Sequence, residues 1–141
     1  MRASLSGAIN TQLDWSDDVL RCESMPRPDA RGVRLRLSGD VGDERLAIII
    51  ALPTLEPGVT GPEFDSVITL TVEDSGRFFS TPNLGTCWTD IETHAAVDDK
   101  QQLFNIVGTV TCVGPLGEFN ADAFIDIRDL HFSALADWSK S

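Results

Sequence analysis

Basic residues are scarce in this sequence. Eleven Lys and Arg stand against 22 Asp and Glu, which gives a formal net charge of −11 at pH 7. A surface of that sign repels the phosphates of nucleic acids and of anionic lipids. We therefore expect no nucleic acid among the partners. The favoured interpretation of the negative charge is that it keeps the protein soluble. Two more specific interpretations are adaptation to high salt and imitation of a polyanion that blocks its binding protein.

Long apolar runs are also missing. The longest apolar stretch, Leu46 to Leu52, is far shorter than the roughly 20 residues of a membrane-spanning helix. The sequence therefore predicts no membrane span. Met1–Ser4 leads at once into an alternating segment, without the apolar core of a secretory signal. We expect either a cytoplasmic protein or a chain from which a signal peptide has been removed.

Cysteine is limited to Cys22, Cys87 and Cys112, and their spacing matches neither a CxxC pair nor a zinc site. Cys87 opens one expected strand and Cys112 lies near the end of the next. Antiparallel pairing of these strands would bring the two together, so we expect a Cys87–Cys112 disulfide and a single Cys22. Pairing of Cys22 with either of the others stays open. A disulfide favours an extracellular or periplasmic location, and the cytoplasm is the alternative.

Alternation of apolar and polar residues runs through the whole chain, and this period of two is typical of half-buried strands. About nine strands are expected and no clear helix. The length of 141 residues fits one domain. We predict a single all-β domain over residues 1–141, an antiparallel β-sandwich of jelly-roll or immunoglobulin-like type, with a small β-barrel as the alternative.

Three segments carry particular expectations. In residues 3–15, apolar Leu5, Ile9, Leu13 and Trp15 stand at odd positions among polar residues, and the segment is expected to form one strand. Leu46–Leu52 is apolar throughout, as in a strand buried on both faces, and is expected to form a hairpin with the strand that begins at Val33. Residues 123–138 change phase between Ile127 and Leu130, so we predict a β-bulge near Asp129.

No catalytic motif is present. The G-x-S-x-G nucleophile motif does not occur, so no catalytic residue is predicted. The strongest metal candidate is the acidic turn that contains Asp40, Asp43 and Glu44, whose carboxylates are suitable calcium ligands. Their spacing differs from the EF-hand loop, and acidic residues are common in turns. Apart from this calcium candidate, no cofactor is expected.

Arginines gather in one part of the chain. Arg34 and Arg36 alternate with apolar residues, and Arg45 begins the next expected strand. Guanidinium groups on one sheet face can bind a carboxylate or sulfate in bidentate geometry, so Arg34, Arg36 and Arg45 are candidates for an anion or partner patch. The favoured interpretation is internal: in so acidic a protein these arginines neutralise their own neighbours.

The histidines and aromatic residues give weaker indications. His94 and His131 lie in different expected strands and are predicted to be exposed on a polar face or at a strand edge. Trp15, Trp88 and Trp138 are expected to belong to the margins of the core.

These observations favour a non-enzymatic, extracytoplasmic module that binds a protein or carbohydrate, or serves a structural role. Two alternatives remain: a hydrolase or lyase on a jelly-roll scaffold, and an acidic inhibitor that mimics a polyanion. A deep pocket with ionisable groups would favour the enzyme, whereas a flat exposed aromatic or apolar patch would favour the binding module.

Overall fold

The computed structural model describes residues 1–25 and 31–139, and all the regular structure in these residues is β-strand. The strands are β1 (Arg2–Gly7), β2 (Thr11–Asp14), β3 (Arg21–Met25), β4 (Val33–Val41), β5 (Glu44–Leu52), β6 (Gly61–Val72), β7 (Arg77–Ser80), β8 (Cys87–Ala96), β9 (Leu103–Cys112), β10 (Leu116–Glu118) and β11 (Phe124–Asp137). The all-β prediction is confirmed. In the described part of the chain, no helix could cross a membrane.

All strand pairs are antiparallel and belong to one sheet. Strands β7 and β8 follow one another along the same edge of β6, because Thr69 pairs with Ser80 of β7 and Ser66 pairs with Cys87 of β8. Strands β10 and β9 follow one another along β11 in the same way. The strands therefore succeed one another from β3 to β11 as they do in the sequence, and the β1–β2 hairpin is added beyond β11.

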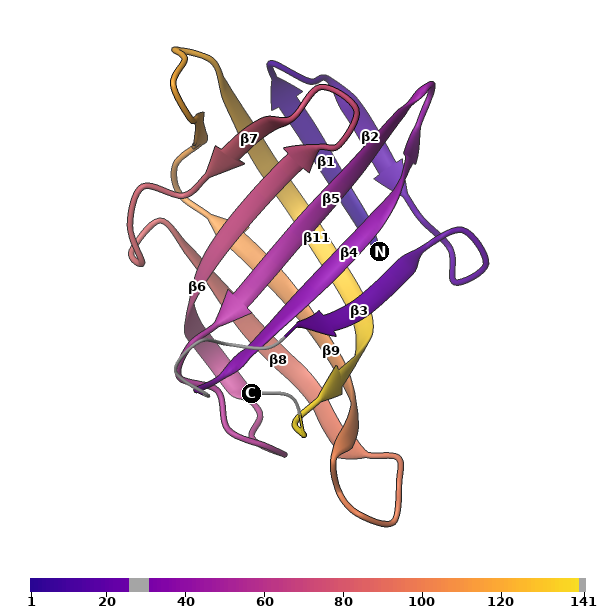
Figure 1. Cartoon of the computed structure of the whole chain (residues 1–141). Coiled ribbons are helices and arrows are strands. Elements are labelled where there is room, and N and C mark those ends of the chain that lie inside the picture. Colours follow the sequence, from indigo (N-terminus) through magenta and orange to yellow (C-terminus); the bar gives the residue numbers. More distant parts are fainter. Residues whose placement is uncertain (26–30, 140–141) are drawn as a thin grey trace.

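The sheet curls until its ends meet, as in a barrel-like sandwich. In Figure 1, β3–β7 cross in front of β1, β2, β11, β9 and β8 at a large angle. The backbone N–H of Asp137 in β11 donates to Ser24 Oγ in β3 at 3.0 Å, and Trp15 Nε1 donates to the carbonyl of Asp40 at 3.2 Å. Trp15 packs directly on Gly39, where a Cβ atom would lie 2.5 Å from the indole ring.

Inward-facing residues of both layers form one core. Its fully buried members include Leu35, Ile48, Ile50, Leu70 and Phe79. Ile48 pairs with Leu70, which pairs in turn with Phe79, so a directly paired row lines the interior. Burial of such side chains contributes about 1.5–3 kcal/mol each.

Two expectations about strand boundaries were wrong. Residues 3–15 form the β1–β2 hairpin and not one strand, because the chain turns at Gly7 (φ +104°), where the Asn10 side chain bonds to both backbone groups of Gly7. Leu5 before the turn and Leu13 after it both point inward at odd positions. The alternation of apolar and polar residues therefore did not reveal the turn. The short strand β10 was also not expected.

Two local predictions are confirmed. Strands β4 and β5 form a hairpin whose two-residue turn has Gly42 at φ +58°, a conformation that glycine adopts without strain. Strand β11 has its bulge at Asp129 (φ +54°): the pairing shifts between Arg2–His131 and Ser4–Arg128.

Neighbouring isoleucines of β5 test the assignment of the two faces. Ile50 is fully buried, whereas Ile49 is only partly buried on the outer side. We expect Ile50→Ala to lower the free energy of unfolding by about 2–5 kcal/mol and Ile49→Ala to lower it by less than half as much. Urea unfolding of the two variants measures both losses. Equal losses would show that the faces are misassigned.

Candidate functional site

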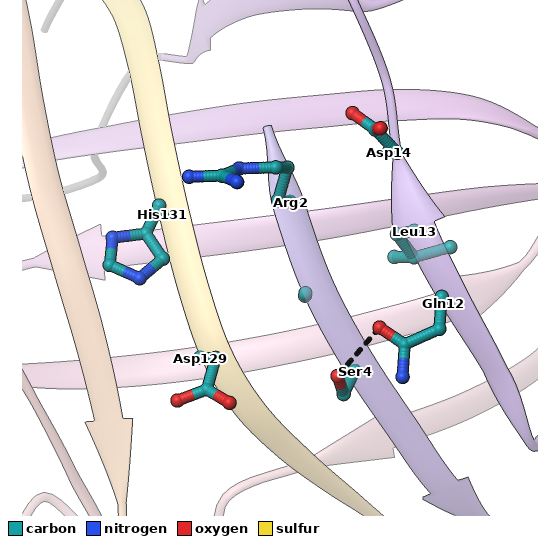
Figure 2. Close-up of a pocket in the computed structure, with 8 residues that line it drawn as sticks. Arg2, Ser4, Gln12, Leu13, Asp14, Asp129 and His131 are labelled. Atoms are coloured by element: carbon teal, nitrogen blue, oxygen red, sulfur yellow. Dashed lines mark hydrogen bonds between the residues drawn. The ribbon is translucent and has the colours of Figure 1, made fainter.

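A polar depression of about 340 Å³ lies on the outer side of β2, β1 and β11 (Figure 2). Arg2 pairs with Asp14 on one side and with His131 on the other, so these three side chains form a row across the strands. Asp129 joins them because the bulge turns it outward into the depression. At the lower end of the depression in Figure 2, Ser4 Oγ donates a hydrogen bond to Gln12 Oε1 at 2.8 Å.

The chemistry of this depression is that of an open polar surface. His131 is exposed, and its Nδ1 lies 3.1 Å from Thr109 Oγ1. The depression presents a guanidinium and an imidazole between two carboxylates, Asp14 and Asp129. It can hydrogen-bond a small polar molecule, and the hydroxyl–imidazole contact between Thr109 and His131 lies on the exposed surface beside it.

His94 corrects a prediction, because the side chain is buried and not exposed. Its Nδ1 lies 2.9 Å from the carbonyl oxygen of Val59, and Trp138 Nε1 donates to its Nε2 at 3.0 Å. The neutral ring, protonated at Nδ1, satisfies both bonds. Burial lowers the pKa of His94, and the bond to Val59 opposes this effect. His94 thus anchors Trp138 to the margin of the core.

Two of the three candidate arginines are bound to acids within the chain. Arg36 forms ion pairs with Glu23, at 3.2 Å, and with Glu73. Arg45 pairs with Asp40 at 3.1 Å and with Glu73 at 3.6 Å. The third, Arg34, lies beside Arg36 on the outer face of β4 and is also engaged. Arg36 and Arg45 thus neutralise acidic side chains of their own chain.

The calcium candidate is not assembled in the structure. Asp40 lies in β4 opposite Arg45, while Asp43 is in the turn and Glu44 begins β5 opposite Val41. Within residues 1–25 and 31–139, no three His, Cys, Asp or Glu side chains form a group that could hold a metal ion.

The predicted Cys87–Cys112 disulfide is confirmed, with an S–S distance of 2.07 Å. The two cysteines lie directly opposite each other in the β8–β9 ladder. Cys22 is free and partly buried against the core, and this burial raises the pKa of its thiol.

The outer side of β5, β6, β7, β10 and β11 presents an unusual surface for so acidic a chain. Directly paired residues share a face, and two such rows cross these strands without a single charge. The first row is Ile49, Thr69, Ser80, Gly117 and Phe124. The second is Ala47, Thr71, Phe78 and Phe119, the last two joined by the bond from Phe119 N–H to the Phe78 carbonyl. We call these nine residues the uncharged face.

Three phenylalanines dominate this face. Phe78, Phe119 and Phe124 are 42%, 71% and 48% exposed. Gly117 lies between Ser80 and Phe124, and a Cβ atom built on it would meet nothing within 4 Å. The rings therefore border an open space and are available to a partner.

Sequence reasoning did not identify this face. Phe78 and the fully buried Phe79 point to opposite sides of β7, so only one of these adjacent rings reaches the surface. The only signal in the sequence was the lack of charge at Thr69, Thr71, Phe78 and Ser80, the outward positions of β6 and β7. The exposed surface forms only because strand pairing brings Phe119 and Phe124, which are distant in the sequence, beside Phe78. No family model, curated protein sequence or solved structure matches this chain.

The environment of His94 predicts a pH dependence of stability. Because its pKa is lowered in the folded protein, the unfolded chain takes up a proton first as the pH falls through about 6.5. We expect the free energy of unfolding to fall between pH 7.5 and 5.5, and His94→Gln to reduce this slope. Denaturant unfolding at several pH values measures it. His131→Gln, which removes the exposed histidine, is the matched control. An unchanged slope in His94→Gln would contradict this account.

Proposed function

We propose that this chain is a non-enzymatic binding module that docks a partner protein through the uncharged face. The observation that carries the proposal is the exposure of three phenylalanines side by side, one on β7, one directly after β10 and one at the start of β11, in a chain with net charge −11. Exposed apolar groups of this kind mark interaction surfaces. Buried aromatic side chains supply much of the binding energy at protein interfaces.

The surroundings of the face support docking more than catalysis. Its members are hydroxyl, methyl and phenyl groups, which offer contact area and hydrogen bonds but no acid, base or nucleophile of catalytic type. Ile48, Leu70 and Phe79 of the core lie beneath this face. The face is therefore fixed in place by the paired strands β5, β6 and β7 and by the core that they cover. A pre-organised surface loses less entropy when a partner binds.

We also propose that the module works outside the cytoplasm. The support is the disulfide between β8 and β9, since such bonds persist in oxidising compartments. Peptide mapping of protein isolated without reductant from its native source tests this proposal. A linked Cys87–Cys112 peptide would support it, and free thiols would contradict it.

Photo-cross-linking in the native source tests the docking face. With a benzophenone amino acid at position 119, we expect a discrete covalent adduct, and we expect Phe78→Ser with Phe124→Ser to reduce its yield about tenfold or more. The same amino acid at position 113 is the control, because Val113 is equally exposed, at 72% against 71%, but lies outside the face. Equal adducts from both positions, or a yield unaffected by the serine changes, would contradict the proposal.

A further inference from the structure

Carboxylates flank the phenylalanine end of the uncharged face. Asp122 lies in the loop that joins Phe119 to Phe124, and Asp126 follows Phe124 by two residues and shares its outward side. Asp74 lies in the turn between β6 and β7, close after Thr71, and its Oδ2 accepts a bond from the backbone N–H of Arg45 at 3.2 Å.

These three aspartates lack the internal neutralisation found elsewhere on the molecule. Arg36, Arg45 and Arg77 all form ion pairs with acids, the last through a bidentate contact to Glu118 with both distances 2.9 Å. By contrast, none of Asp74, Asp122 and Asp126 forms an ion pair within the part of the chain that the structure describes. The next outward residue of β11 is the cation Arg128, which lies opposite Ser4 and away from the rings.

The size of the face argues against a second copy of the chain as its occupant. With strands about 4.8 Å apart and residues about 3.3 Å apart, two rows over five strands cover roughly 300–400 Å². A stable protein pair buries about 800 Å² on each partner. A dimer through this face would have to bury the aspartate rims of both copies, each carrying a net charge of −11, which like-charge repulsion opposes.

We propose that the occupant is a short segment of another protein that carries apolar side chains interleaved with lysine or arginine. This inference rests on the proposed function, because it assigns a partner class to the same face. The apolar side chains of the segment fill the space over Gly117 between the phenylalanines, and its cations meet Asp74, Asp122 and Asp126. A cation beside these rings also gains the attraction of their π faces.

Charge pairs at the rim of an interface act mainly on the association rate, and salt weakens them. The apolar contacts at its centre act mainly on dissociation. The two contributions can therefore be separated in one binding experiment.

The experiment uses three eight-residue probe peptides, alternating Lys-Phe, Glu-Phe and Lys-Ser, titrated against the full chain with NMR and calorimetry. We expect only the Lys-Phe peptide to bind and to shift the resonances of β7, β10 and β11. Phe119→Ser should weaken the affinity for the Lys-Phe peptide about tenfold. Neutralising all three aspartates (Asp74→Asn, Asp122→Asn, Asp126→Asn) should weaken the affinity for this peptide about fivefold. Raising the salt concentration from about 50 to about 500 mM should have the same effect on the parent protein.

The matched control neutralises three exposed aspartates away from the face: Asp17→Asn, Asp18→Asn and Asp99→Asn. We expect this variant to bind almost as the parent does, and a thermal melt of each variant confirms that it is folded. If Phe119→Ser weakens binding but the rim variant and salt do not, the basic partner class is wrong and the docking face stands. If Phe119→Ser has no effect, both proposals fail. Binding of the Glu-Phe peptide, or a dimer in sedimentation that Phe119→Ser abolishes, would overturn the basic segment as the occupant.

Discussion

The pairing register of β4, β5 and β6 is the constraint on which the rest of the structure depends. Adjacent side chains of a strand lie on opposite faces, so the register that buries Leu37, Ile48 and Leu70 in the core also turns Ser38, Ala47 and Thr71 toward the outer face, where other side chains cover Ser38 and Ala47. A slip by one residue would exchange the two sets. Core and outer face are therefore two consequences of one register, and neither can shift without the other.

The same register divides the outer face into two chemically different parts. On β4 and the start of β5, Arg36 and Arg45 converge on Glu73 and cover Ser38, whose side chain is completely buried beneath them. The outward residues of β7 and β10, which are Phe78, Ser80 and Gly117, carry no charge, and phenyl rings take the place of the arginines there. Arg36 and Arg45 are bound to the chain's own acids, whereas the uncharged part of the face has exposed rings. The docking face that we propose is thus the part of the surface that the charge pattern of the sequence does not indicate.

The sequence predicted features that depend on local alternation and missed those that depend on pairing between distant strands. The change of phase in residues 123–138 located the bulge at Asp129, and strand ends located the Cys87–Cys112 pair. The β1–β2 turn was not predicted because the inward-facing residues stand at odd positions both before and after it. His94 appeared exposed because its bonds to Val59 and Trp138 arise from segments 35 and 44 residues away. The phenylalanines meet only through β10, a strand too short to show alternation.

Covalent footprinting of the phenylalanines tests the central claim, that the uncharged face is covered by a partner in the native setting. Photoactivated carbene labelling would be read by mass spectrometry at Phe78, Phe119 and Phe124, in the native source and in the isolated protein. Val113, equally exposed but outside the face, is the internal reference. We predict that labelling of the three phenylalanines is reduced in the native source while Val113 is labelled equally in both. Equal labelling of the phenylalanines in both settings would contradict the account.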